Sequence, residues 1–398
     1  MKAKKSMVPF FAVMAAFQLA ASFAHPVTPT IFTNLNLGSY MFGVALAAMM
    51  TVNFLFSPFW GKINTYISSR NSMMISSIGY ALGQVMFGLA QTEAQVIGAR
   101  MFAGLFTGGA FVSMLTYIVN FSENEKIRGK YLTLYATIQS VCGAFGYFVG
   151  GFLGVKSPYV SVTAQVIVLA ACGIGFRIFC DDDTKISIKL MDRKAFIKEA
   201  NPFKAFADSK LFMTSLLAVL FAMCVLQNLG MNAFDQTFNY YIKDIFDFPS
   251  TYNGALKGIM GLITLIANST ICMWLINRTN VNKSIIGVFV LCSSTMLIAV
   301  LFDSVVPFVA SNVIFYAFNG ISIPLLQNMV ANKSKEGNSN LIMGFYNAMK
   351  SLGGIVGALL SGFLYTFNPK FPFIFGFAAF LIALICSVYY YKNDREKA

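Results

Sequence analysis

Charged residues are scarce in this sequence. Only 11% of its 398 residues are Asp, Glu, Lys or Arg, and 57% are hydrophobic, whereas a soluble domain averages about 25% charged residues. The few charges stand in short clusters between long apolar runs. This pattern excludes a soluble globular enzyme, a disordered chain and a disulfide scaffold. It indicates a helical membrane protein with many spans, because a bilayer core requires apolar runs of about 20 residues.

Residues that carry enzymatic or metal chemistry are also rare. The single histidine excludes a His-Glu-x-x-His site and most histidine metal clusters. The seven cysteines are scattered through apolar runs without a Cys-x-x-Cys pair, so they are interpreted as buried apolar side chains. No Gly-x-x-x-x-Gly-Lys-Ser/Thr phosphate loop occurs, which argues against ATP as the energy source. We therefore expect no enzymatic activity, no cofactor and no metal.

The apolar runs predict an all-α membrane protein with twelve transmembrane helices. Their predicted bounds are 7–29, 39–60, 72–90, 94–120, 130–153, 158–180, 211–239, 252–276, 284–302, 305–332, 341–366 and 372–391. The first run follows Lys2, Lys4 and Lys5 and ends in small residues, as a signal peptide does. It is long enough to span, and its removal would leave an odd number of spans, so we expect it to be the first helix.

One long charged connection, residues 181–210, divides the twelve spans at their midpoint. The sequence therefore predicts two six-helix bundles, residues 1–180 and 211–398, joined by this linker. Within the linker, the stretch Arg193 to Phe206 mixes charged and apolar residues, which favours a helix lying on the membrane surface.

The distribution of Lys and Arg predicts the orientation. Of 29 such residues, 23 fall on the side of the two termini and the linker, and four fall on the opposite side. Excess Lys and Arg marks the cytoplasmic side, so both termini are expected there. The net charge of +13 is explained by this topology, and we do not expect nucleic-acid binding.

An internal repeat relates the fifth and eleventh predicted spans. At an offset of 211 residues, seven positions between 135–154 and 346–365 are identical, and they include tyrosine, serine, phenylalanine and leucine as well as glycines. The offset corresponds to six spans. Two parallel six-helix repeats are one signature of secondary transporters, in which the substrate path lies between the repeats.

Local motifs in the fourth and fifth spans resemble those of the major facilitator superfamily, and the resemblance covers the whole chain. The fourth span carries the Arg-x-x-x-Gly-x-x-x-Gly pattern as Arg100, Gly104 and Gly108. The fifth is similar to the glycine-rich motif of drug:proton antiporters, with Tyr147 where those proteins usually have proline. The glycines of this fifth-span motif are Gly143, Gly146, Gly150 and Gly151, and Gly354 and Gly357 are repeat-related glycines of the eleventh span.

The loop between the second and third spans departs from the family pattern. Gly61 and Arg70 are retained, but Thr65 stands where the family has an acid. The resemblance implies that the charge latch of this loop, which stabilises the outward-facing state in the family, is weakened or differently built.

A second resemblance is to symporters of the lactose-permease type. Phe234-Asp235-Gln236 is similar to a segment of their seventh span, and Lys350 falls where they carry a lysine. In that group the acid pairs with the lysine. Their proton-carrying Glu and His of the tenth span have no counterpart here, where Asn319 and Gln327 are the polar residues. The resemblance therefore covers the helix framework and does not imply sugar:proton symport.

Three ionisable residues inside the predicted spans are candidates for a charge pair or for proton coupling. Asp235 is the only acid within a span; it either couples protons, contacts substrate, forms a static ion pair or lies at the outer interface. Lys350 lies about 15 Å deep at 1.5 Å per residue, so it is expected to face a cavity or an acid. Arg100 either takes part in coupling or helix contact, or extends to the outer surface.

Amides supply the remaining polar groups of the spans, either as cavity-lining candidates or as hydrogen-bond partners between helices. They are Gln18, Asn53, Gln139, Gln227, Asn228, Asn232, Asn239, Asn268, Asn312, Asn319, Gln327 and Asn347. The densest group lies in the seventh span around Gly230, where we expect a break in the helix.

The sequence as a whole predicts a secondary transporter of the cell membrane that works by alternating access as a monomer. The most specific prediction is proton-coupled export of lipophilic or amphipathic small molecules, with protonation of Asp235 weakening its pairing with Lys350 or Arg100. Three alternatives stay open: proton-coupled uptake of a sugar-like or other polar solute, flipping of lipid-linked cargo, and a sensor or scaffold without transport.

Overall fold

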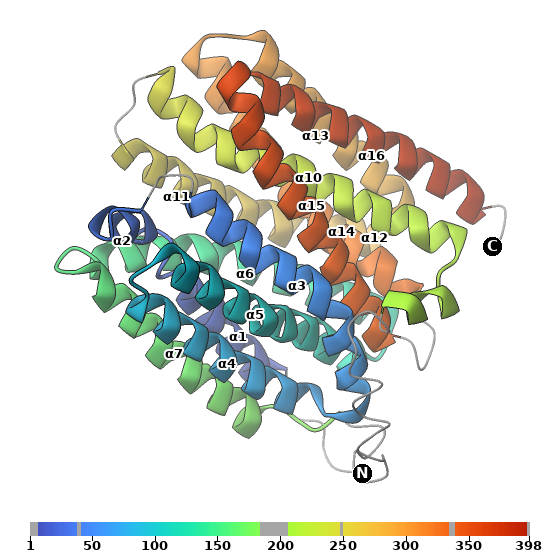
Figure 1. The fold of residues 1–398 in the computed structure, drawn as a ribbon. Coiled ribbons are helices and arrows are strands. Elements are labelled where there is room, and N and C mark those ends of the chain that lie inside the picture. Colours follow the sequence, from blue (N-terminus) through green and yellow to red (C-terminus); the bar gives the residue numbers. More distant parts are fainter. Residues whose placement is uncertain (1–6, 38–40, 184–205, 247–249, 334–338, 396–398) are drawn as a thin grey trace. The chain divides into compact units, whose positions relative to one another are not determined.

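The computed structural model describes residues 7–37, 41–183, 206–246, 250–333 and 339–395. These residues are predominantly helical and contain no strand, as the ribbon in Figure 1 shows. The helices are α1 (Val8–Ala21), α2 (Thr28–Asn34), α3 (Met41–Tyr66), α4 (Ser69–Leu89), α5 (Glu93–Phe121), α6 (Glu125–Leu153), α7 (Pro158–Phe179), α10 (Ser215–Asp244), α11 (Ser250–Ala267), α12 (Met273–Arg278), α13 (Val281–Leu301), α14 (Val305–Asn332), α15 (Ser339–Phe367) and α16 (Phe371–Arg395). A π-helical turn, Asn268–Cys272, joins α11 to α12.

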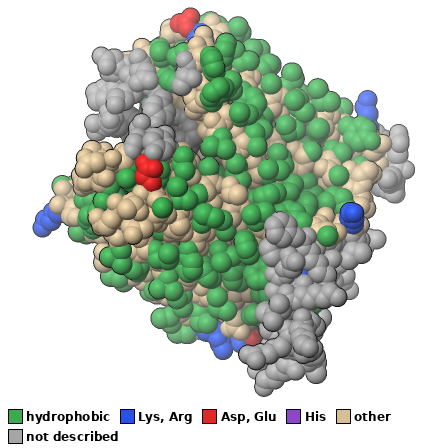
Figure 2. Space-filling view, viewed as in Figure 1, with side chains coloured by type: hydrophobic (Ala, Val, Ile, Leu, Met, Phe, Trp, Pro, Cys, Tyr) green, Lys and Arg blue, Asp and Glu red, His purple; other side chains and the backbone are tan. Residues whose placement is uncertain are grey.

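The predicted all-α membrane fold is confirmed. Within the described residues, eleven helices are long and apolar enough to cross a membrane, and α1 is a shorter apolar helix at the place of the first predicted span. The bounds agree closely where apolar runs end at charged or small residues; α14 has the predicted bounds, 305–332. Large apolar side chains such as Phe148 and Val155 stay exposed, and Figure 2 shows apolar side chains over much of the visible surface, as a lipid-facing surface requires.

The first predicted span, 7–29, is not a single helix. Helix α1 ends at Ala21, turns follow, and α2 begins at Thr28. Pro26 and Pro29 lie in this stretch, and each lacks the N–H that would continue the α-helical ladder. Pro29 instead stands in the first turn of α2, a position at which proline is tolerated.

The expected break at Gly230 is wrong, because α10 runs uninterrupted from Ser215 to Asp244. Gly230 serves packing: a Cβ there would lie 2.7 Å from the ring of Phe380 and 3.3 Å from the carbonyl oxygen of Gly376. A small residue at this point lets α16 approach α10 closely.

The chain forms two compact units. Unit 1 comprises residues 1–122, 142–212 and 334–348, and unit 2 comprises 123–141, 213–333 and 349–398. Unit 1 contains the contacts of α4 with α5 and α7, and unit 2 those of α10 and α13 with α16. The predicted bundles 1–180 and 211–398 stay a prediction. Of the linker stretch predicted to lie on the membrane, 193–206, all but Phe206 falls outside the described residues.

Candidate transport site

Helix α10 presents a polar row inside unit 2. Asn228, Asn232 and Asp235 recur every three to four residues, so they share one side of the helix, and Gln227 directly precedes the first of them. Thr214 begins the helix by accepting a hydrogen bond from the N–H of Leu217 at 3.2 Å, as an N-cap residue does. The row places four polar side chains along about two turns of a helix whose first three turns are almost entirely apolar.

Asp235 is fixed by a tyrosine of α14. The hydroxyl of Tyr316 donates a hydrogen bond to the Asp235 carboxylate, and both side chains are half-buried. The ring of Tyr316 lies 5.6 Å from Phe234 and 6.4 Å from Phe238. The only acid within a predicted span is thus held beside aromatic rings. Hydrogen bonds to a charged acceptor are about twice as strong as neutral ones.

One amide of the polar row, Gln227, connects α10 to α14, and its neighbours bond along α10. Gln227 donates to the side chain of Asn319 at 2.7 Å, and Asn228 donates to Gln227 at the same distance. Asn232 donates to the backbone oxygen of Asn228 one turn earlier. Gln227 and Asn319 are almost completely buried. Of these three bonds, the one between Gln227 and Asn319 joins two helices, and the other two lie within α10.

Lys350, on α15, lies beside a part of α10 that is well separated from Asp235. Glycines of α15 follow it: a Cβ at Gly353 would lie 2.3 Å from the Val225 oxygen, and one at Gly357 would lie 2.4 Å from the Leu229 oxygen. Lys350 interacts electrostatically with Cys224. Cys224 and Asp235 are eleven residues apart, about 16 Å along the helix. These contacts therefore hold Lys350 and Asp235 at different depths of unit 2.

Arg100 belongs to unit 1, where it is buried near the start of α5. Its guanidinium lies 3.9 Å from the ring centre of Phe87 and donates to the hydroxyl of Thr28 at 3.3 Å. Only 7% of the residue is exposed. Arg100 therefore does not extend to the outer surface, which was the alternative to a part in coupling or helix contact.

Asn53 and Asn347 form an amide cluster in unit 1. Asn347 donates to the side-chain oxygen of Asn53 at 3.0 Å and to the hydroxyl of Ser57 at 2.8 Å. Asn53 also donates to Thr107 at 3.4 Å. A Cβ at Gly61, the glycine retained from the family loop pattern, would lie 2.5 Å from the oxygen of Asn340. The first part of α15 therefore packs closely against α3.

The other predicted cavity amides differ in their surroundings. Gln18 is 4% exposed and its side-chain nitrogen has no hydrogen-bond partner within the described structure. Asn268 is fully buried at the start of the π-helical turn, with neither amide atom bonded to a described residue. Gln139, the repeat counterpart of Lys350, is half-buried. The side chain of Asn239 lies outside the described structure.

The glycine motifs mark close helix contacts that the repeat duplicates. A Cβ at Gly146 of α6 would lie 2.0 Å from the backbone oxygen of Leu19 in α1. A Cβ at Gly357 of α15 would lie 2.4 Å from the backbone oxygen of Leu229 in α10. These two residues follow Gly146 and Leu19 by about the 211 positions of the repeat. Gly150 and Gly104 likewise face the backbone of Phe23 and Met49, whereas Gly143, Gly151 and Gly108 face side chains and Gly354 is buried. The repeat seen in the sequence therefore corresponds to repeated packing.

The loop between α3 and α4 is held by acids from the start of the linker. Asp183 accepts from the N–H and hydroxyl of Ser69, both at 2.6 Å, and from Asn120 at 2.9 Å. Arg70 pairs with Asp182 at 2.6 Å. A carboxylate at a helix N-terminus is stabilising because it faces the positive end of the helix dipole. The acid missing at Thr65 is thus replaced by acids more than 110 residues later.

The contacts of Asp183 and Asp182 with the start of α4 predict that replacing these two acids lowers stability by different amounts. We expect Asp183→Ala to lower stability by about 1–2 kcal/mol, because it leaves the first turn of α4 without its carboxylate cap. We expect Asp182→Ala to cost less, about 0–1 kcal/mol, because its ion pair with Arg70 is partly exposed. Thermal unfolding of the two purified variants beside the parent checks this order, and an equal or reversed order would contradict the capping role.

Comparisons with known proteins agree with this architecture. A model of the Major Facilitator Superfamily matches residues 10–306 and 269–398. The chain is 20% identical to Multidrug resistance protein 2 of Bacillus subtilis, over 94% of this chain and 92% of that protein. It is 21% identical to the class C tetracycline resistance protein of Escherichia coli, over 96% of both chains. The solved structure of the human organic anion transporter MFSD10 superposes with a TM-score of 0.82, at 13% identity, over 96% of this chain and 98% of that one.

Proposed function

The chain belongs to the Major Facilitator Superfamily and is therefore a transporter and not an enzyme, and we propose that it exports lipophilic or amphipathic small molecules in exchange for protons. Two observations support the direction and the cargo. The multidrug and tetracycline resistance proteins named above align with more than nine-tenths of the chain. The only acid within a predicted span, Asp235, is placed beside aromatic rings in unit 2.

The observation that carries the proposal is the hydrogen bond between Tyr316 and Asp235. As a carboxylate, Asp235 accepts this bond strongly and attracts a cationic or amphipathic cargo. When it takes up a proton, it loses its charge, the bond from Tyr316 weakens, and the electrostatic attraction for a cation is lost. The proton and the cargo therefore compete for one group, which is the simplest basis for exchange.

Lys350 and Arg100 take supporting parts in this proposal. Lys350, on α15, lies near Cys224 of α10. We propose that it binds polar parts of the cargo in the part of unit 2 that is away from Asp235. The sequence-based prediction that Asp235 pairs with Arg100 or Lys350 stays a prediction. The coupling proposed here relies on Tyr316 as the partner of Asp235. Alternating access exposes Asp235 to one side of the membrane and then to the other.

The membrane setting follows the sequence. We propose that the protein lies in the cell membrane, spans it many times, has both termini in the cytoplasm and works as a monomer. Cysteine accessibility to an impermeant reagent, introduced separately near the C-terminus and at Lys156, tests the orientation. Labelling of the C-terminal site from outside intact cells would contradict it.

The proposed function is tested by flux in proteoliposomes under an imposed proton gradient. We expect a dye-like lipophilic cation to move against its gradient when protons flow the other way, and we expect labelled sugars not to accumulate. Sugar accumulation without dye movement would replace the proposal by solute uptake. Absence of both fluxes from a correctly folded preparation would reject it in favour of lipid-linked cargo or a role without transport.

A further inference from the structure

Unit 1 contains a buried positive charge whose donors are mostly unused. The guanidinium of Arg100 has five N–H donors, and within the described structure it makes one hydrogen bond, to Thr28 at 3.3 Å. Thr28 in turn donates to the backbone oxygen of Ala24 at 2.7 Å. The remaining contact is with the face of Phe87, which attracts a cation but accepts no strong hydrogen bond.

No carboxylate of the described residues lies within ion-pair distance of Arg100. Glu93, on the same helix, stands seven residues earlier, about 10 Å along the axis. Arginine keeps its charge in proteins, and burying an ion without a counter-charge is strongly unfavourable. A stable fold at this position therefore calls for a negative group that the described residues do not supply.

Neutral polar groups with unused bonding capacity lie in the same bundle. Gln84 is fully buried on α4, three residues before Phe87, and its amide makes no hydrogen bond of normal geometry within the described structure, although Tyr80 lies close enough to interact with it. One turn earlier, Tyr80 accepts from Gln165 at 3.3 Å and interacts electrostatically with Arg100. Residues 80, 84 and 87 share one face of α4. That face therefore presents a phenol, a buried amide and the ring that the guanidinium lies over.

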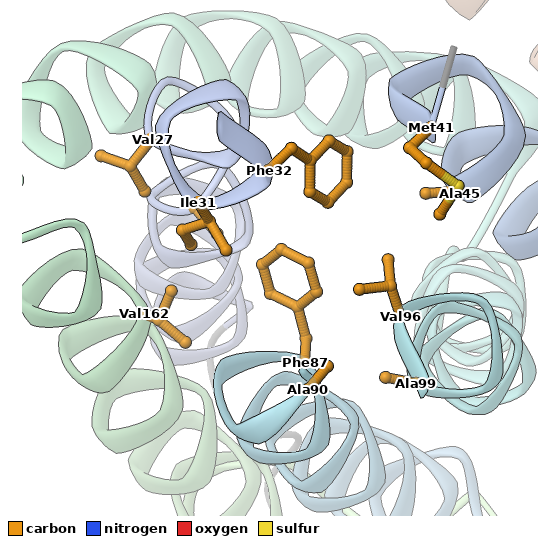
Figure 3. Packing of buried hydrophobic residues seen from close by; sticks show 11 residues of the cluster. Val27, Ile31, Phe32, Met41, Ala45, Phe87, Ala90, Val96, Ala99 and Val162 are labelled. Atoms are coloured by element: carbon orange, nitrogen blue, oxygen red, sulfur yellow. The ribbon is translucent and has the colours of Figure 1, made fainter. Parts of the chain in front are cut away.

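Apolar side chains form a wall around the start of α5. Figure 3 shows Val27, Ile31, Phe32, Phe87 and Val96 among the residues of this cluster, which also includes Ala99, the neighbour of Arg100 in sequence. A large polar solute would have to bury much unbonded polar surface against this wall. A small, weakly hydrated anion needs only a few N–H donors and tolerates apolar walls.

We propose that unit 1 holds a small monovalent anion of the halide class, chloride under ordinary conditions, on the guanidinium of Arg100 and the amide of Gln84. The anion neutralises a charge that no described carboxylate pairs with, and it accepts hydrogen bonds from guanidinium donors that the described residues leave free. The site is distinct from the proposed exchange site, because that site is formed by α10 and α14 of unit 2. Its presence does not depend on the direction of transport or on proton coupling.

The test is the anion dependence of thermal unfolding of the full chain in lipid nanodiscs. We expect the unfolding temperature to rise with chloride or bromide concentration and to saturate, because an anion that binds only the folded state stabilises it. Sodium gluconate at the same ionic strength is expected to give no such rise. Equal unfolding temperatures in all three salts would overturn the proposal.

Variants locate the effect. Arg100→Gln is expected to fold, since it removes an unneutralised buried charge, and to lose the halide response. Gln84→Leu keeps the charge and is expected to need about tenfold more halide for half the response, because one donor is lost. Asp235→Asn, in unit 2, is the control that keeps the parent response. A halide response that persists in Arg100→Gln would reject the site.

Bromide gives a direct readout that does not depend on how the variants fold. In crystals grown with sodium bromide, we expect an anomalous difference peak within hydrogen-bond distance of the Arg100 guanidinium and the Gln84 amide. Crystals of the Gln84→Leu variant should show a weaker peak. Density for water alone beside Arg100 at saturating bromide would show that solvent fills the space, and would overturn the proposal.

Discussion

Replacing Asp235 by asparagine is expected to abolish proton-driven transport while leaving downhill dye exchange in place. For one-for-one exchange, a gradient of one pH unit supports about tenfold accumulation of cargo, because each pH unit is worth 1.36 kcal/mol. Asparagine fills the same space and still accepts a hydrogen bond from Tyr316, but it neither binds nor releases a proton. The accumulation ratio should therefore fall to about one, measured as gradient-driven dye flux in proteoliposomes.

The matched control is Asp303→Asn, which removes the same charge elsewhere in unit 2. Asp303 pairs with Lys370 at 2.5 Å, but its own side chain is 83% exposed, so an effect on coupling is not expected. Both variants should unfold at temperatures close to that of the parent. Full concentrative transport by the Asp235→Asn protein would show that proton coupling lies on another group, and an equal loss in both variants would point to folding.

The apolar periodicity and the repeat predicted most of the fold, because they reflect local requirements of a bilayer. Span bounds follow from where charge begins, and the glycines of α6 and α15 follow from the need for close helix approach. Both repeat-related tyrosines, Tyr135 and Tyr346, are almost completely buried. Positions fixed by the solvent and by immediate helix neighbours are thus readable from the chain itself.

Contacts between distant segments were the part that the sequence could not supply. Tyr316 stands between Asn312 and Asn319 on α14, a spacing that could have drawn attention to it. Its bond to Asp235, however, depends on which face of α14 is turned toward α10. The clamp of Ser69 by Asp183 joins residues 114 positions apart. The break between α1 and α2 was visible in Pro26 and Pro29, but the apolar run outweighed that signal.

The alanine variants of two repeat-related glycines, Gly146 and Gly357, are expected to be strongly destabilising for so small a substitution. A methyl group at Gly146 would lie 2.0 Å from the Leu19 oxygen, and one at Gly357 would lie 2.4 Å from the Leu229 oxygen. Both obstacles are backbone atoms, which cannot rotate away as a side chain can. The helices must separate, and overpacking of this kind typically costs about 1–3 kcal/mol. Thermal unfolding in nanodiscs measures the loss.

Gly98 provides the control, because it is also a helical glycine but a Cβ there meets no atom within 4 Å. Gly98→Ala should leave stability unchanged or raise it by up to about 1 kcal/mol, since alanine is the better helix former. If Gly146→Ala and Gly98→Ala unfolded at the same temperature, the close approach of α6 to α1 would not be a requirement of the fold. Loss of stability in both Gly146→Ala and Gly357→Ala, and not in Gly98→Ala, would establish that the repeat preserves the contact of α6 with α1 and that of α15 with α10.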